Sequence, residues 1–422
     1  MALYNLRVLQ LHTPADLQKE LEQVGVSPTQ LTDLGAQGIC RAVKLERISL
    51  RLARFLFQEL TLEGGQAALP PRLASRDAAV SETDALLLGT RYQLQHLAVR
   101  IRTQSESELD ILADELERAL DLFDHPRHAA LKIGAVNFDW GARTYVMGIV
   151  NVTPDSFSGD GVMAQSNDFV ARAVAHAERL LADGADLLDI GGESTRPGSQ
   201  PITADEERAR VIPVIERLRP KVGAPISIDT YRADTARAAL DAGADLVNDV
   251  WGLRMDAEMK HIVAQRGVPV VIMHNRSQPK DAVQTERLGG RYIGVEYQDL
   301  MADVIRELRG QIDLALDAGI APDKIIVDPG IGFGKTVEQN LELLNRLDEL
   351  RVLGYPILLG PSRKGFIGYT LNLPVDQRVE GTAAAVALGI ERGADIVRAH
   401  DVKPMVRVAK MTDAVVRKTR LP

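Results

Sequence analysis

The sequence has little of several features, and each shortage excludes a class of protein. Cys40 is the only cysteine among 422 residues, so no intramolecular disulfide can form, and we expect its side chain to be a small buried hydrophobe. The longest apolar runs, such as AAAVALGI at 383–390, are far shorter than the roughly 20 residues of a membrane span. A net charge of -8 argues against a general nucleic-acid-binding protein, which needs a broad basic face.

The rest of the composition is that of an ordinary globular protein. Apolar residues make up 45% and charged residues 26%, and the length predicts about two or three domains with a sizeable core. The first residues contain no charged segment followed by an apolar run and a cleavage site. We therefore expect a soluble, cytoplasmic protein with neither a membrane nor a nucleic acid as partner.

From Thr144 onward a short sequence pattern recurs, in which a helix end is followed by a glycine and a strand. It reads LLADGADLLDI, ALDAGADLVNDV, ALDAGIAPDKIIVD and IERGADIVRAHDV, with Gly184, Gly243, Gly319 and Gly393 at the shared position. A glycine just past the last helical turn tolerates the positive φ that often ends a helix. The strands that follow are short and rich in Val, Ile and Leu, as parallel strands buried on both faces are.

These strands, with YVMGIVN, APISIDT, VPVVIMH and YPILLGPSRK, give eight strand patterns between Tyr145 and His400. Helical patterns separate them. Eight strand–helix units of roughly 30 to 35 residues predict an α/β fold, a (β/α)8 TIM barrel of about 250 residues. A doubly wound open sheet is the alternative, but it usually has fewer strands.

Residues 1–125 lack this repeat and predict a smaller N-terminal domain, α/β or mostly helical, before a barrel domain at 126–422. PADLQKELEQVG and ESELDILADELERAL have helical patterns, and LQHLAVRIRT at 94–103 is a candidate strand. We find no set of residues in this part that is typical of a catalytic site, and we expect a packing, oligomerisation or regulatory module. The segment 131–150 predicts two short strands joined at Gly141, a hairpin that could close the bottom of the barrel.

Polar residues stand at the end of every predicted barrel strand. They are Asn151, Asp189, Glu193, Asp229, Asn248, Asp249, His274, Asp328, Lys364, Arg398 and His400. In a barrel all these ends meet at one rim, where barrel enzymes carry out their chemistry. A single polar residue at such a place can simply cap the next helix, but eight polar ends in eight favour a functional rim.

The segment DPGIGFGKT at 328–336 looks like a phosphate-binding loop, but its spacing is wrong. The pattern G-x-x-x-x-G-K-[ST] requires a glycine where Pro329 stands, and proline has no N–H to offer. Thr336 and Gln339 instead predict a capping box that opens a helix. We therefore expect structural roles for Lys335 and Thr336, and we assign the functional role to Asp328 at the strand end.

Seven motifs, in order, strongly resemble dihydropteroate synthase. They are MGIVNVTPDSFSGDG at 147–161, DIGGESTRPGS at 189–199, ISIDT at 226–230, VND at 247–249, DPGIGFGKT at 328–336, GPSRKGFIG at 360–368 and RAHDV at 398–402. The resemblance runs from near Val136 to the C-terminus, so residues 1–125 are not part of the usual family chain. It implies a transferase of folate biosynthesis that joins 6-hydroxymethyl-7,8-dihydropterin diphosphate to 4-aminobenzoate, giving 7,8-dihydropteroate and pyrophosphate, with Mg²⁺ and in a homodimer.

The resemblance also implies a role for each matching position. The pterin would contact Asp229, Asn248, Met273, Asp328 and Lys364; the diphosphate, Asn151, Thr195, Arg398 and His400; and 4-aminobenzoate, Thr195, Pro197, Phe333 and Ser362. The implied catalytic residues are Asn151, Arg196, Lys364, Arg398 and His400. Asn151 would be the protein's contact to Mg²⁺, which would otherwise bind diphosphate and water.

Three positions depart from common family patterns. Gly365 follows Lys364 where many members have a serine that contacts the carboxylate of 4-aminobenzoate. The first loop reads SFSGDG instead of SFSDGG, which moves its acid to Asp160, and the fifth strand ends MHNRS instead of MHMQG. The pterin contacts are therefore better supported than the loop contacts.

Two other functions share the pterin-holding barrel. A methyltransferase that passes a methyl group from a methylated folate to a corrinoid has the same Asp and Asn strand ends, but it has no diphosphate that needs cations. The motifs ESTRPG, SRK and RAHDV supply such cations and favour the synthase. A non-catalytic pterin-binding paralogue is expected to lose Arg196, Lys364 or Arg398, and all three are present.

Overall fold

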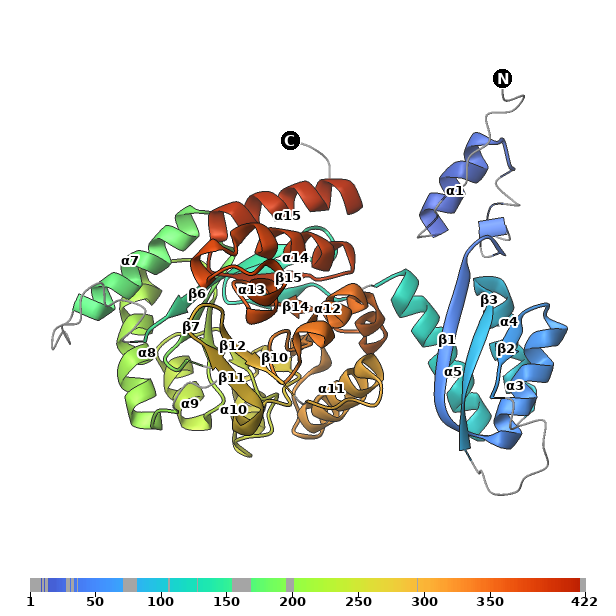
Figure 1. Cartoon of the computed structure of the whole chain (residues 1–422), viewed down its shortest axis with the longest axis horizontal. Coiled ribbons are helices and arrows are strands. Elements are labelled where there is room, and N and C mark those ends of the chain that lie inside the picture. The colour runs from blue at the N-terminus through green and yellow to red at the C-terminus, as the bar shows by residue number, and fades with distance from the viewer. Residues whose placement is uncertain are drawn as a thin grey trace. The chain divides into compact units, whose positions relative to one another are not determined.

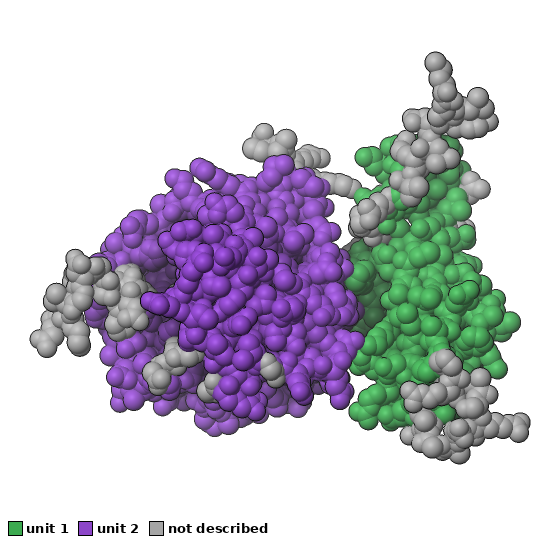
Figure 2. Space-filling view, viewed as in Figure 1, with its two compact units in different colours: residues 1–126 green, residues 127–422 purple. Residues whose placement is uncertain are grey.

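The computed structural model describes residues 9, 11, 14–27, 31, 34–35, 37–70, 82–104, 107–126, 128–153, 168–194, 201–293 and 295–417. The chain divides into two compact units, Met1–Pro126 and Arg127–Pro422 (Figure 2). Among the described residues, no helix is both long and apolar enough to cross a membrane.

The first unit is a small α/β unit. Its antiparallel sheet has the order β1-β3-β2, with β1 at Cys40–Ser49, β3 at Glu82–Thr90 and β2 at Gln66–Ala68. The helices are α1 (Pro14–Gln23), α3 (Leu50–Leu62), α4 (Arg91–Arg102) and α5 (Ser107–Asp124) (Figure 1). Leu56, Leu87, Leu97 and Leu116 pack α3, α4 and α5 with the sheet in one apolar core.

Two expectations for this unit were wrong. The candidate strand at 94–103 is part of α4, because Leu94, Leu97 and Ile101 follow helical spacing and are buried on one face. A capping box between Thr90 and Gln93 opens that helix. Cys40 is exposed at the start of β1 instead of buried in the core.

The second unit confirms the eight-stranded parallel barrel. Its strands are β6 (Tyr145–Asn151), β7 (Leu187–Gly191), β8 (Ile226–Asp229), β9 (Leu246–Asp249), β10 (Val270–Met273), β13 (Ile325–Asp328), β14 (Leu358–Leu359) and β15 (Ile396–Ala399). They lie in the order β13-β10-β9-β8-β7-β6-β15-β14. A parallel bridge between Val327 and Ile357 joins β13 to the segment before β14, so the sheet is closed and the open-sheet alternative is wrong.

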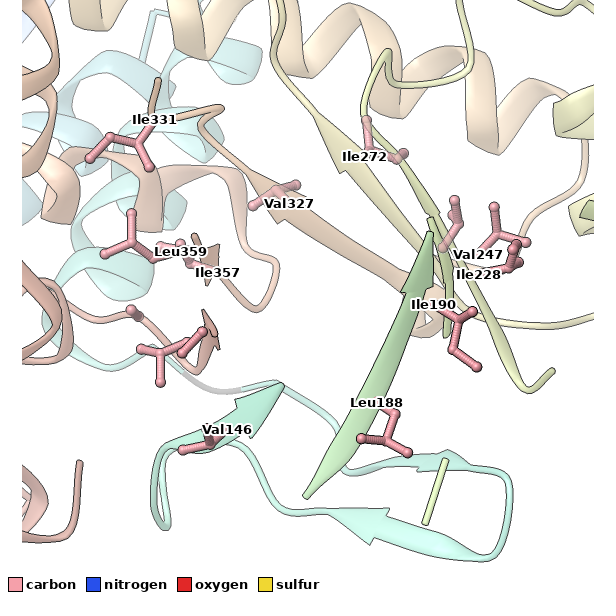
Figure 3. Packing of buried hydrophobic residues seen from close by; sticks show 14 of the residues in the cluster. Val146, Leu188, Ile190, Ile228, Val247, Ile272, Val327, Ile331, Ile357 and Leu359 are labelled. Carbon is pink, nitrogen blue, oxygen red and sulfur yellow. The ribbon is translucent and has the colours of Figure 1, made fainter. Parts of the chain in front are cut away.

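Helices surround the barrel strands (Figure 1). They are α7 (Asp168–Ala182), α8 (Ala204–Leu218), α9 (Ala233–Asp241), α10 (Met259–Arg266), α11 (Leu300–Asp317), α12 (Val337–Asn345), α13 (Gly365–Leu371), α14 (Val379–Glu391) and α15 (Val402–Val416). Short 3-10 turns lie at Arg219–Lys221, Pro279–Asp281, Pro322–Lys324, Leu347–Leu353 and Val375–Gln377. Val146, Ile190 and Ile272 belong to the core between strands and helices (Figure 3).

The repeated glycines have the backbone conformation that the sequence predicts. Gly184, Gly243, Gly319 and Gly393 have φ of 103°, 108°, 90° and 105°. A side chain at any of them would be strained in this region of φ, so glycine lets each helix turn directly into the next strand.

A β-hairpin closes the bottom of the barrel, as expected, but its turn is at a different glycine. Strands β4 (Leu131–Ile133) and β5 (Val136–Phe138) pair antiparallel and are joined at Gly134, whose φ is 57°. Gly141, the predicted turn, lies instead in the loop between β5 and β6. The hairpin residues share one buried cluster with the first residues of the strands, namely Leu131, Ile133, Phe138, Trp140, Tyr145, Met147, Leu187, Leu246, Val271, Ile326, Leu358 and Ile396.

Phe138→Ala is expected to lower the free energy of unfolding of the barrel by about 3 to 5 kcal/mol, because the phenyl ring fills the closed end. The ring is fully buried and its centroid lies 4.5 Å from that of Tyr145. Urea unfolding followed by tryptophan fluorescence would measure the change, since Trp140 and Trp251 both lie in this unit. Leu314→Ala, on an exposed helix position, is the control, and equal loss in both variants would contradict the closing role.

Candidate active site

The carboxyl rim of the barrel is organised by a largely buried group of one arginine, two aspartates and an asparagine, here called the arginine–carboxylate cluster. Arg398 Nε donates to Asp189 Oδ2 at 2.6 Å, and its Nη2 donates to Asp229 Oδ2 at 2.7 Å. Asn248 Nδ2 donates to the same Asp189 oxygen at 2.9 Å. The cluster therefore connects β15, β7, β8 and β9 near the barrel mouth.

Burial sets the electrostatics of this cluster. It raises the pKa of Asp229 to about 7, against the opposing effect of the Arg398 charge. Burial alone would lower the pKa of Arg398, but Asp189 and Asp229 outweigh it and raise that pKa. The guanidinium is thus held charged in a site from which most water is excluded, where its interactions are stronger than at the surface.

Asp328 lies at the end of β13 and is almost fully buried. Its Oδ1 accepts a hydrogen bond from the Gly330 backbone N–H at 2.7 Å, and burial raises its pKa to about 6. Gly330 has a φ of 69°, and a Cβ there would collide with the carbonyl oxygen of His274. Only glycine allows the loop to turn so sharply behind the carboxylate.

Lys335 holds this loop from inside the protein. Its Nζ lies 2.9 Å from His274 Nδ1 and donates to the carbonyls of Gly330 and Phe333 at 3.1 and 3.2 Å. His274 Nε2 lies 3.1 Å from Glu307 Oε2, and burial lowers the pKa of His274 to about 3, so the ring is neutral and Nδ1 accepts. The structural role expected for Lys335 is therefore confirmed.

The predicted capping box is also present. The Thr336 side chain accepts from the Gln339 backbone N–H, and the Gln339 side chain accepts from the Thr336 backbone N–H. Both residues are accounted for by the start of α12.

An apolar wall adjoins the carboxylates. Lys364 Nζ lies 3.8 Å from the centroid of the Phe333 ring, a distance at which a cation is attracted to the ring face. Phe333 packs with Met273 and Val250. A Cβ on Gly332 would lie 2.8 Å from Lys364 Cδ, so this glycine lets the lysine stem approach the loop closely.

Ser362 and His400 are in direct contact with each other. The His400 backbone N–H donates to Ser362 Oγ at 3.1 Å, and His400 Nδ1 lies 3.0 Å from the same oxygen. Between Ser362 and Lys364, Arg363 has a φ of 57° and binds Asp401 through Nε and Nη2 at 2.8 and 2.6 Å. The seventh-strand loop is therefore fastened to the loop after β15.

Some of the predicted site residues contact one another, whereas others form hydrogen bonds or ion pairs with neighbouring residues outside the cluster. Asp249 accepts from the backbone N–H groups of Trp251 and Leu253, so its role is local. Glu193 pairs with Arg232 at 2.5 Å, beside Tyr231. The predicted residues Thr195, Arg196 and Pro197, and the acid Asp160, lie outside the described residues.

Asp189 is the residue that sequence reasoning left without a role. Its Oδ2 accepts from both Arg398 and Asn248, while its Oδ1 is buried and has no hydrogen-bond partner among the described residues. Its place on a barrel strand was visible in the sequence. Its partners were not, because they lie 209 and 59 positions away along the chain.

Comparisons with known proteins give the same family as the sequence motifs. Residues 147–400 match the family model described as pterin binding enzyme. The chain is 47% identical to dihydropteroate synthase of Clostridium beijerinckii over 289 residues, which are 68% of this chain and 100% of that relative. The chain belongs to the dihydropteroate synthase family of pterin-binding enzymes.

A solved structure and a longer relative add to this. The Xanthomonas albilineans dihydropteroate synthase with 4-aminobenzoic acid is 43% identical, with a TM-score of 0.61 covering 69% of this chain and 99% of that chain. A probable bifunctional folylpolyglutamate synthase/dihydropteroate synthase of Halobacterium salinarum is 39% identical over 400 residues, 94% of this chain and 46% of that relative. That match must include most of the first unit as well as the barrel.

Lys335→Met is expected to remove a pH dependence of stability. Burial lowers the pKa of Lys335 from 10.5 to about 7. Between these values the unfolded chain holds one more proton than the folded chain, so the wild type gains stability relative to the variant as the pH rises from about 7 to 10. Urea unfolding at several pH values would measure this, with exposed Lys410→Met as the control; parallel curves for wild type and Lys335→Met would contradict it.

Proposed function

We propose that the protein condenses 6-hydroxymethyl-7,8-dihydropterin diphosphate with 4-aminobenzoate to give 7,8-dihydropteroate and pyrophosphate. The observation that carries the proposal is the arginine–carboxylate cluster on the rim, with Asp328 and Lys364 beside it. Together these residues offer hydrogen-bond acceptors to the polar edge of a pterin and positive charges to a diphosphate. Relatives from Xanthomonas albilineans, solved with 4-aminobenzoic acid and with 7,8-dihydropteroate, support the same ligand chemistry.

In this proposal the pterin lies over Met273 with its polar edge toward Asp328, Asn248 and Asp229. An unpaired buried carboxylate is costly, and the pterin N–H groups would supply Asp328 with the donors that water supplies elsewhere. Lys364 would donate to a pterin acceptor from the other side. The burial of Asp328 and Asn248 favours this assignment, because each can then discriminate a ligand by its hydrogen bonds.

The leaving diphosphate would be bound by Asn151, Thr195, Arg398 and His400, and Arg196 would be a further catalytic cation. We expect the C–O bond to break early, because the electron-rich dihydropterin ring can stabilise the resulting carbocation. The aniline nitrogen of 4-aminobenzoate then attacks that carbon, and no strong general base is required. Stabilising the leaving group would account for much of the rate, as preorganised charges usually do.

The second substrate would lie against Phe333, near Lys364, Ser362, Thr195 and Pro197. The ring of Phe333 offers an apolar face to an aromatic acid, and the Lys364 ammonium above it offers a charge to the carboxylate. Gly365 has no side chain that could take the place of the serine common in the family. The carboxylate would therefore depend on Lys364 and the loop contacts.

The proposed reaction also uses Mg²⁺. The amide oxygen of Asn151 is a suitable Mg²⁺ ligand, and the ion would neutralise diphosphate charge when bound.

Leu388, Met411 and Val415 expose apolar side chains on α14 and α15, which supports a homodimer through barrel helices. We assign the protein to the cytoplasm. Residues 1–125 would have a packing, oligomerisation or regulatory role, and the barrel domain at 126–422 would carry out the chemistry.

Two alternatives are less well supported. A methyl transfer to a corrinoid gives no reason for cations such as Arg398 and Lys364 at the rim. A non-catalytic pterin-binding paralogue gives no reason to keep Arg196 together with them.

The proposal is tested by pyrophosphate release from the pterin diphosphate, measured with and without 4-aminobenzoate in the presence of Mg²⁺. We expect release that depends on 4-aminobenzoate, and a rate lowered by about 10²- to 10³-fold in Arg398→Ala. Exposed Arg407→Ala is the matched control and should keep the wild-type rate. Release that ignores 4-aminobenzoate, or no release from the wild type, would overturn the assignment.

A further inference from the structure

Arg378 is a buried arginine whose hydrogen bonds to the described residues all end on backbone carbonyls. It is 2% exposed and lies just before α14. Nη1 donates to the carbonyls of Arg363 and Lys364 at 2.9 and 3.3 Å, and Nη2 to those of Leu288 and Leu373 at 2.9 and 3.1 Å. Nε also donates to the Leu373 carbonyl at 3.1 Å.

Burying the Arg378 charge costs free energy, which suggests that the side chain has a structural role. Burial lowers the pKa of Arg378, yet a guanidinium stays charged in proteins, so a full charge is buried here with no bonded carboxylate in the described part of the chain. Hydrogen bonds from a charged donor offset part of the desolvation. A lysine could not replace this side chain, because its single ammonium cannot reach carbonyls on several segments at once.

The carbonyls belong to three segments, and one of them is the site loop. Arg363 and Lys364 form the loop after β14, whose lysine lies over Phe333. Leu373 follows α13. Leu288 lies in the turn of a hairpin formed by β11 (Ala282–Thr285) and β12 (Gly289–Tyr292), which belongs to the long loop after β10. Arg378 therefore ties the loop of the fifth barrel strand to the loop of the seventh.

Glycines at the contact allow the segments to approach. A Cβ on Gly368 would collide with the Arg378 guanidinium, and a Cβ on Gly365 would lie 2.5 Å from the carbonyl oxygen of Gly290 in the hairpin. The hairpin thus occupies the space next to Gly365 where the common family serine would need room. Tyr369 fastens it further, since its hydroxyl donates to the Gly289 carbonyl at 3.2 Å.

The Lys364 backbone is therefore held from several directions. Arg363 has a left-handed φ of 57°, which is unusual for a residue with a side chain and persists only where surrounding bonds impose it. Its N–H donates to Thr382 Oγ1 at 3.2 Å and its carbonyl accepts from Arg378. Without the arginine, the strained residue before Lys364 would lose the bond on its carbonyl side.

We propose that Arg378 is a positioning residue for the subsite of the second substrate. It holds the β11–β12 hairpin against Gly365 and fixes the Lys364 ammonium above Phe333, where it meets the carboxylate of a small aromatic acid. The inference rests on the proposed function. Lys364 is also one of the proposed pterin contacts, but the other polar contacts, Asp229, Asn248 and Asp328, receive no hydrogen bond from Arg378, so binding of the pterin substrate depends on it less.

The test is steady-state kinetics of the full chain with both substrates varied. Arg378→Lys is expected to raise the KM for 4-aminobenzoate about tenfold, the effect of weakening a hydrogen bond to a charged group, with less than about a twofold change in the KM for the pterin diphosphate. Added ethylguanidinium should lower the raised KM in Arg378→Ala. Arg346→Met, which removes a partly exposed arginine paired with Glu342 and Glu349, is the matched control and should change neither KM.

Gly365→Ala provides a second route if the Arg378 variants do not fold. Its methyl group would push the Gly290 carbonyl away while Arg378 stays in place, and the KM for 4-aminobenzoate should rise in the same selective way. Equal rises in both KM values, or no rise in either variant that folds, would overturn the positioning role. A wild type that releases no pyrophosphate would instead overturn the proposed function, so the two failures are distinguishable.

Discussion

The rim of the barrel depends on the pairing of one largely buried guanidinium with two carboxylates. Arg398 comes from the last strand and reaches Asp189 and Asp229 on the second and third strands. Burying such charges is costly, so removing any one of them would leave its partners uncompensated. Because the cluster joins ends from across the mouth, the proposed positions of the pterin and of its leaving group are set together.

The fold supplies the rigidity that this pairing requires. The β4–β5 hairpin fills the amino end of the barrel, which leaves the carboxyl end as the open face. At that face the loops are fastened from behind by buried side-chain nitrogens that donate to backbone carbonyls, Lys335 for the Asp328 loop and Arg378 for the Lys364 loop. Two side chains that touch no proposed substrate thus determine where two substrate-contacting side chains lie.

Much of the architecture could be predicted because its signals are local. The helix–glycine–strand pattern and the Thr336 capping box each depend on a few neighbouring residues. The rest could not, because the bonds between Lys335 and His274, Arg378 and Leu288, and Arg398 and Asp189 join residues 61, 90 and 209 positions apart. Residues 94–103 were misassigned because apolar and β-branched residues masked a helical spacing, and Cys40 because its exposure depends on tertiary packing.

A double-mutant cycle on Asp189→Asn and Arg398→Lys tests the central claim most directly. The quantity to measure is kcat/KM for the pterin diphosphate in the wild type, both single variants and the double variant. If the arginine–carboxylate cluster acts as a unit, the effects will be non-additive by about 1 to 3 kcal/mol. Effects that add to within about 0.5 kcal/mol would contradict the account, because they would mean that the two side chains act independently.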